Sequence, residues 1–188
     1  MSLVNRVFEH PLRQIAGRVL LCTFIANQDV ASVATGRPRP VYVFTMTAPI
    51  ESKDLAYQDQ TVRMAFRINR ADVVLSILNL AKSPIRVNWN EVAYVDPDGH
   101  PHDIVHSRQP AVLPPTANLT DSMVPADFIY SNGAGKLTAW QQRDLFPKPT
   151  RKEARKYDGR SFSLYIPIEI DGAVRNYLLT FAIRINDA

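Results

Sequence analysis

Apolar and polar residues alternate with a period of two along most of the chain after Pro40. This alternation is typical of strands that turn one face to a core and the other to water. The last such segment is the clearest, because Tyr177, Leu179, Phe181 and Ile183 share one face. The pattern predicts strands over residues 41–47, 61–69, 73–80, 85–95, 102–107, 162–170 and 177–185.

Turn residues separate these segments. Asp96-Pro97-Asp98-Gly99 has proline second and glycine fourth, as a type I turn prefers, and Asp171-Gly172 suits a tight hairpin between the last two strands. Helix is expected at most near the N-terminus and over residues 150–157. Short strands at this spacing predict an all-β fold, a single antiparallel immunoglobulin-like β-sandwich with Trp89 in its core.

Residues 108–136 lack strong periodicity and contain four prolines, Pro110, Pro114, Pro115 and Pro125. A segment of this length without periodicity is usually functional, or it is tied to a sheet by extended edge pairing. We therefore expect a long loop here.

Composition narrows the class of protein. A chain of 188 residues with 46% hydrophobic residues and a formal charge of +4 can bury a core, which excludes a disordered protein. Its single cysteine, Cys22, can form neither an internal disulfide nor a thiolate zinc site. We divide the chain into an N-terminal segment, residues 1–35, and a β-sandwich domain, residues 36–188.

The N-terminal segment places basic residues before a short apolar run, residues 19–26. This order is similar to a degenerate secretory signal, and it makes Cys22 a candidate for processing or lipidation. Leu21, however, is not the small residue that lipoprotein processing requires before the cysteine. The alternative is a terminus packed on the domain, with Cys22 as a small buried residue. A membrane-spanning helix is not expected, because it needs about 20 apolar residues.

Three histidines, His100, His102 and His106, project to the same side of an extended strand. Together with Asp98 or Asp103 as an oxygen ligand, they are candidates for a zinc, copper or nickel site. We prefer the alternative, in which they lie on the solvent side of an edge hairpin. The sequence thus predicts no metal and no cofactor.

Positive charge is concentrated in residues 143–160, which hold seven basic and three acidic residues. The candidate basic patch consists of Lys148, Arg151, Lys152, Arg155 and Lys156. Such a patch can be simply solvated, or it can contact a protein partner, an anionic membrane surface or nucleic acid. Nucleic acid is the least favoured partner, because the interleaved aromatic residues of a single-strand binding platform are missing.

Motifs of common catalytic sites are absent from the sequence. The stretch Asn132-Gly133-Ala134-Gly135-Lys136 has Tyr130 and Leu137 where a phosphate loop requires glycine and a hydroxyl residue. Neither G-x-S-x-G nor H-E-x-x-H occurs. We therefore expect that the protein is not an enzyme.

Several turn and core residues follow one another over residues 76–107. They include the turn Ser83-Pro84-Ile85, a strand with Trp89, the Asp96 to Gly99 turn and Val105-His106-Ser107. Over roughly residues 55–187 the pattern resembles a group of uncharacterised bacterial envelope lipoproteins of β-sandwich type. The resemblance implies a bacterial envelope or periplasmic location, with the cytoplasm as the alternative, and it implies no catalytic residues. This chain departs from the group at Cys22, which has no lipobox.

Together these features predict a structural or protein-interaction module of a bacterial envelope or a larger envelope assembly, with a protein partner or a homo-oligomer. The alternative is a ligand- or metal-binding protein that uses the His100 to His106 hairpin and residues 108–136. A binding protein requires that the histidine face, residues 108–136 and residues 143–160 converge around a concave site with polar groups. A structural module instead shows exposed strand edges or an apolar patch.

Overall fold

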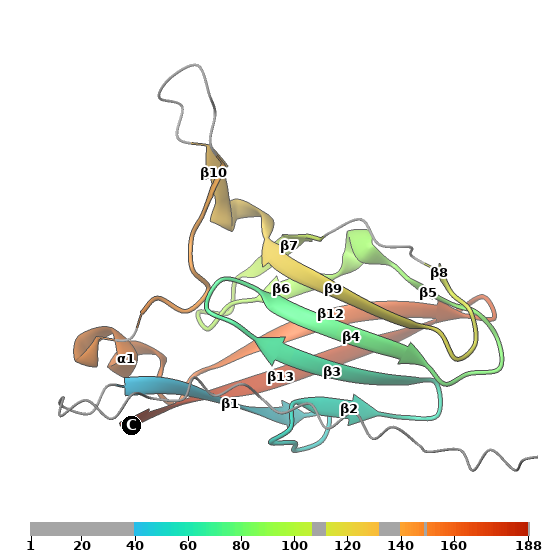
Figure 1. Ribbon diagram of the computed structural model, residues 1–188, viewed down its shortest axis with the longest axis horizontal. Coiled ribbons are helices and arrows are strands. Elements are labelled where there is room, and N and C mark those ends of the chain that lie inside the picture. Colours follow the sequence, from blue (N-terminus) through green and yellow to red (C-terminus); the bar gives the residue numbers. More distant parts are fainter. Residues whose placement is uncertain (1–39, 107–111, 132–139, 149, 188) are drawn as a thin grey trace, which may run out of the picture. The chain divides into compact units, whose positions relative to one another are not determined.

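The computed structural model describes residues 40–106, 112–131, 140–148 and 150–187, which belong to one compact unit. Its strands, in chain order, are β1 (Pro40–Ala48), β2 (Ala56–Gln58), β3 (Val62–Ile68), β4 (Val73–Asn79), β5 (Ile85–Val87), β6 (Ala93–Val95), β7 (Pro101–Val105), β8 (Val112–Leu113), β9 (Asn118–Pro125), β10 (Ile129–Ser131), β11 (Trp140–Gln142), β12 (Ser161–Ile170) and β13 (Ala173–Asp187) (Figure 1). The helical elements are two 3-10 helices, Trp89–Glu91 and Ala126–Phe128, and the α-helix α1 (Arg151–Tyr157).

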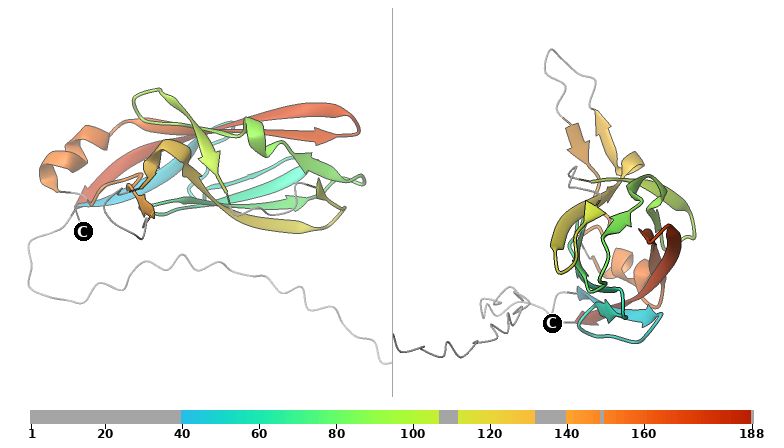
Figure 2. Two further views of the ribbon diagram at one scale, coloured as in Figure 1. Left: turned by 90° about the horizontal axis from the view of Figure 1, so that it is seen from above. Right: turned by 90° about the vertical axis from the view of Figure 1, so that its right-hand side faces the viewer.

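The strands form an 11-stranded antiparallel sheet with the order β1-β13-β12-β6-β7-β9-β4-β3-β2, to which β5 and β8 are added beside β12. Viewed end on, this sheet rolls around its core, and the β10–β11 hairpin projects from it (Figure 2). The predicted all-β antiparallel class is confirmed. Because one path of ladders joins the strands, the two separate sheets of an immunoglobulin-like sandwich are not confirmed.

The core follows directly from the alternation in the sequence. In β3, Val62, Met64 and Phe66 are buried, whereas Arg63 and Arg67 are exposed. At one end of the core, Phe162 on β12 stacks on Phe181 on β13, with ring centres 5.0 Å apart. The period of two therefore predicts correctly which residues are buried in these strands.

The strand β13 lies between β1 and β12, so the first and last strands described are neighbours (Figure 1). A two-residue turn joins β12 to β13, with positive φ angles of 49° at Asp171 and 77° at Gly172. Asparagine, aspartate and glycine tolerate this backbone conformation best. The predicted tight hairpin is confirmed, and α1 lies within residues 150–157, one of the only two places where helix was expected.

The single strand predicted over residues 85–95 is wrong. Strands β5 and β6 both pair with β12, and the 3-10 helix Trp89–Glu91 separates them. Opposite this interruption lies Pro167, which has no N–H to donate to a ladder, and its carbonyl oxygen accepts the N–H of Asn88 at 3.0 Å. Trp89 thus lies in a helical turn rather than in mid-strand, but its side chain is buried as expected.

A second correction concerns residues 108–136, which contain a strand of the sheet interior. β9 lies between β7 and β4, and its residues Leu119, Asp121 and Met123 are buried. Residues 118–125 are therefore not a loop or an edge segment. The polar Asp121 occupies a core position, which interrupts the apolar alternation that marks other strands.

The predictions for Cys22 and for the division near residue 35 lie outside the described residues and stay predictions. In the part of the chain that the structure describes, no helix has the length and apolar character needed to cross a membrane.

Candidate functional site

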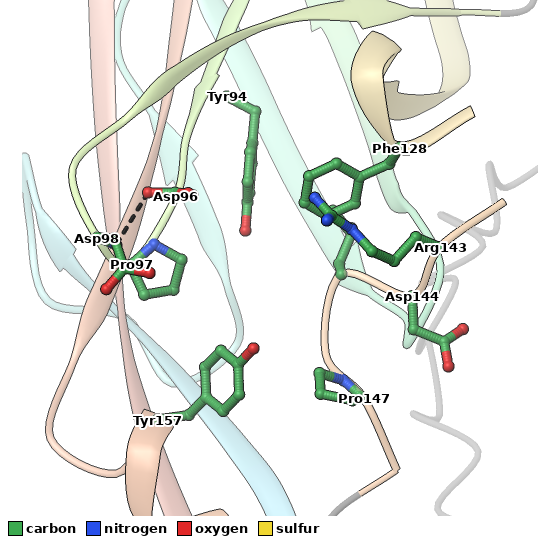
Figure 3. Close-up of a pocket in the computed structure, with 10 residues that line it drawn as sticks. Tyr94, Asp96, Pro97, Asp98, Phe128, Arg143, Asp144, Pro147 and Tyr157 are labelled. Atoms are coloured by element: carbon green, nitrogen blue, oxygen red, sulfur yellow. Dashed lines mark hydrogen bonds between the residues drawn. The ribbon is translucent and has the colours of Figure 1, made fainter. Parts of the chain in front are cut away.

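A pocket of about 400 Å³ opens between the turn after β6, the 3-10 helix Ala126–Phe128 and the segment from β11 to α1 (Figure 3). The residues that line it are Tyr94, Asp96, Pro97, Asp98, Phe128, Arg143, Asp144, Leu145, Pro147 and Tyr157. This volume is within the range of small-molecule sites.

Two of the three segments that the sequence singled out meet at this pocket. Residues 108–136 contribute Phe128, and residues 143–160 contribute Arg143 and Tyr157. The histidine face contributes no lining residue, although the turn before it, Asp96 to Asp98, does. The convergence that the ligand-binding alternative required is therefore present only in part.

Tyr94 is the most buried polar residue of the pocket, with only 2% of its surface exposed. Figure 3 shows the hydroxyl groups of Tyr94 and Tyr157 pointing toward the same space, which Arg143 approaches from the side of Phe128. The Tyr94 hydroxyl forms no hydrogen bond with another described residue. Burial, followed by the nearby Asp96 carboxylate and Tyr157, raises the pKa of Tyr94 well above its ordinary value of 10.0. Tyr94 is therefore a protonated donor at neutral pH.

The carboxylate of Asp96 organises the neighbouring turn. Its Oδ1 accepts the backbone N–H groups of Asp98 and His100, each at 2.9 Å, and Gly99 adopts a positive φ of 88°. Burial alone would raise the pKa of Asp96, but these hydrogen bonds and one from His102 hold it below its ordinary value of 3.8. The turn therefore presents an ionised carboxylate that is already bonded within the protein.

His102 joins this turn to the opposite wall of the pocket. Its Nε2 lies 3.2 Å from Asp96 Oδ2 and its Nδ1 lies 2.9 Å from Asp127 Oδ2. The imidazole also meets the Phe128 ring edge-on, with ring centres 5.5 Å apart. His102 thus fixes the spacing between the turn and the 3-10 helix.

Arg143 supplies a positive charge to the pocket. Its guanidinium carbon lies 3.9 Å from the centre of the Phe128 ring. The next residues hold the backbone in place, because Leu145 and Phe146 are buried and Asp144 pairs with Arg70 at 3.0 Å.

The three histidines do not share one face toward solvent, so that prediction is wrong. His100 is 74% exposed in the turn, whereas the His102 and His106 side chains are only 12% and 22% exposed. The side chains of His102 and His106 pack against Phe128 and Trp89, while Pro101, Asp103 and Val105 on the other face of β7 are exposed. Strand β7 also pairs with both β6 and β9, so it is not an edge strand. Among the residues described, no group of three or more His, Cys, Asp or Glu side chains could hold a metal ion.

His106 lies apart from the other two histidines. It stacks on Trp89, with ring centres 4.5 Å apart, and its Nδ1 lies 3.2 Å from Asp121 Oδ2. This pair explains why a carboxylate occupies a core position of β9.

The basic patch adjoins the pocket along the chain. Lys148 follows the pocket residue Pro147, and Lys156 precedes the pocket residue Tyr157. Lys148, Lys152, Arg155 and Lys156 are exposed, and Arg151 begins α1.

Comparison with protein families, with curated proteins and with solved structures found no match. The resemblance to bacterial envelope lipoproteins over residues 55–187 therefore stays a prediction.

Sequence reasoning did not identify Tyr94 and Phe128 as site residues. Tyr94 had a usable signal, because it lies two residues before the Asp96 turn on the same side of an alternating strand. Phe128 had none, because its position depends on a 3-10 helix that no periodicity marks.

Proposed function

We propose that this domain is a non-enzymatic binding module whose pocket holds a small ligand. The observation that carries the proposal is the Tyr94 hydroxyl, which faces the pocket from a buried side chain and has no partner among the described residues. Because this hydroxyl opens onto the pocket, its O–H can donate to an acceptor that enters there. Water or a ligand can supply that acceptor.

The side chains around the pocket support binding rather than chemical conversion. Tyr94 has a raised pKa and is a poor nucleophile near neutral pH. Both ring nitrogens of His102 face carboxylates, those of Asp96 and Asp127, so this histidine positions the walls instead of serving as a free base.

A thermal-shift screen of metabolite-sized compounds tests this proposal. A ligand at ten times its Kd stabilises the folded chain by about 1.4 kcal/mol, which raises Tm by about 3–6 °C for a domain of this size. We expect such shifts for the unaltered chain and not for a Tyr94→Phe/Arg143→Ala variant. Arg67→Ala, which changes an exposed arginine of β3 outside the pocket, is the matched control. The pocket is not the binding site if no compound shifts Tm, or if every hit shifts the Tm of the unaltered chain and of the Tyr94→Phe/Arg143→Ala variant equally.

A second candidate function, contact with a protein partner, is favoured by the edge strand β1. Apart from a bridge between Met46 and Ser52, β13 is its one ladder neighbour among the described residues, and Val41 and Val43 are 46% and 38% exposed. An exposed apolar edge can pair with a strand of another chain. Size-exclusion chromatography with light scattering checks for self-association, which Val43→Lys should abolish. A monomer at every concentration would contradict a homo-oligomer formed through β1.

Location at a bacterial envelope and contact of the basic patch with an anionic membrane surface stay predictions.

A further inference from the structure

We propose that the ligand of this pocket carries a carboxylate group, bound by the Tyr94 hydroxyl and the Arg143 guanidinium. The inference rests on the proposed binding function and adds the charge and the functional group of the ligand. Some polar groups of the pocket are already bonded within the protein, whereas others remain available to a ligand.

The three carboxylates of the pocket are already bonded. Asp96 accepts two backbone N–H groups and faces His102. Asp98 pairs with Arg160, and Asp144 pairs with Arg70. A cationic ligand would have to compete with these protein cations and N–H groups for each carboxylate.

The two donors, in contrast, are available. Tyr94 has no acceptor, and Arg143 forms no ion pair among the described residues. The guanidinium carbon of Arg143 lies over the Phe128 ring at 3.9 Å from its centre, and its N–H groups bond to no other described side chain. A planar guanidinium edge matches the two oxygens of a carboxylate, and the phenol adds a third hydrogen bond.

The positive charge of the adjoining segment also favours an anionic ligand. Lys148, Lys152, Arg155 and Lys156 are exposed, and no ion pair of theirs occurs in the described part of the chain. Their field attracts an anion over roughly a Debye length of about 8–10 Å. Asp96, Asp98 and Asp144 oppose a dianion, however, so a monoanionic carboxylate fits better than a phosphate.

The remaining walls are apolar or aromatic. Phe128, Leu145, Tyr157 and the prolines Pro97 and Pro147 offer surface to a ring or a short hydrocarbon. The ligand is therefore an aromatic or aliphatic monocarboxylate, either a free acid or the C-terminus of a peptide.

NMR titrations of the full chain, labelled with ¹⁵N, test the chemistry of the ligand. The three probes, benzoate, benzamide and benzylamine, each carry a different group on a benzene ring. A fragment of this size reaches a Kd of about 1 mM, so each probe is added to about 10 mM. We expect benzoate to shift the amide signals of Tyr94, Arg143 and Tyr157, with benzamide at least fivefold weaker and benzylamine without effect there. N-acetyl-phenylalanine, which imitates a peptide C-terminus, and its amide extend the test. If N-acetyl-phenylalanine binds more tightly than benzoate, the carboxylate of the ligand is that of a peptide C-terminus.

Two variants test the assigned residues. Tyr94→Phe and Arg143→Lys should each weaken benzoate binding about tenfold, because each removes a hydrogen bond to a charged acceptor. The matched controls Tyr165→Phe and Arg67→Lys, whose side chains do not line the pocket, should leave the affinity unchanged.

The outcomes separate the inference from the proposed function. If benzamide or benzylamine shifts the same signals as strongly as benzoate, the carboxylate assignment is wrong while the binding function stands. If Tyr94→Phe binds benzoate normally, Tyr94 is not a ligand-binding residue and the inference fails. If none of the probes shifts these signals, the inference fails, and the thermal-shift screen decides the proposed function separately.

Discussion

The guanidinium group of Arg143 lies on the ring of Phe128, at 3.9 Å from its centre, and the backbone N–H of Arg143 donates to the carbonyl oxygen of the same phenylalanine at 2.8 Å. One residue of the 3-10 helix thus holds both the backbone and the charge of the pocket's arginine. Because these two residues come from different segments, the position of the charge depends on how the segments pack.

Replacing Phe128 with leucine should therefore weaken benzoate binding without removing any charge. A cation–π contact of about 0.5–1 kcal/mol at an exposed site corresponds to roughly a two- to fivefold loss of affinity. The NMR titration measures this change. Phe66→Leu, at another buried phenylalanine, is the control for lost stability, and equal affinity in both variants would contradict the role of the stack.

Asp96 should make stability depend on pH in the acid range. Because its pKa in the folded chain lies below the ordinary value of 3.8, the stabilisation is present above about pH 4 and is lost as the pH falls through the folded pKa. Asp96→Asn should lower the free energy of unfolding by about 1–2 kcal/mol at pH 7 and reduce the loss of stability on acidification. Urea denaturation at pH 7 and pH 3 measures both effects. The control is Asp54→Asn, at an exposed aspartate; an Asp96→Asn variant that is as acid-sensitive as the unaltered chain would refute the prediction.

Asn79 should be one of the residues most important for stability. It is fully buried, and its side-chain amide donates to the carbonyl oxygens of Ser83 and Leu113 while its Oδ1 accepts the N–H of Ala81. Asn79→Ala should cost about 3 kcal/mol or more, since it removes three hydrogen bonds to backbone groups, although the Ala81 N–H also donates to the carbonyl oxygen of Thr61. Asn79→Asp should also destabilise, because a carboxylate cannot donate. Chemical denaturation measures the loss, and Asn90→Ala, at an exposed position, should change little.

His106 should report on the packing of Trp89. Loss of its ring and of its contact with Asp121 in His106→Ala should cost about 2–4 kcal/mol. In a Trp140→Phe background, the emission of Trp89 should shift to the red, because the stacked ring no longer shields the indole. His106→Phe, which keeps a ring, should give a smaller shift, and His100→Ala should give none. An unchanged spectrum for His106→Ala would show that the stack does not shield Trp89.

The strands were predictable wherever side chains alternate over several residues and turns have distinctive chemistry. Asp171-Gly172 shows this, because a turn with two positive φ angles leaves few alternatives. Trp89 shows the limit. Its burial was predictable, whereas its helical turn depends on Pro167, a residue distant in the sequence that interrupts the opposing ladder.

The sequence could name candidate segments for a site, but it could not show which of them meet. Charge and missing periodicity marked residues 143–160 and 108–136, which do line the pocket, whereas the histidine face does not. Their meeting depends on β9, a strand that the polar core residue Asp121 conceals in the sequence. Hydrogen bonds between distant residues, such as those of His102 with Asp96 and Asp127, leave no local pattern in a single sequence.

The pairing of β1 with β13 also determines when this protein can fold. The hydroxyl of Thr47 donates to the carbonyl oxygen of Thr180, 133 residues later in the chain. During synthesis β1 therefore leaves the ribosome long before its ladder partner β13 has been made. Until then the apolar residues of β1 lack this pairing. Contacts of such long sequence separation slow folding. Pairing of β1 therefore has to follow the synthesis of β13, the last of the described strands.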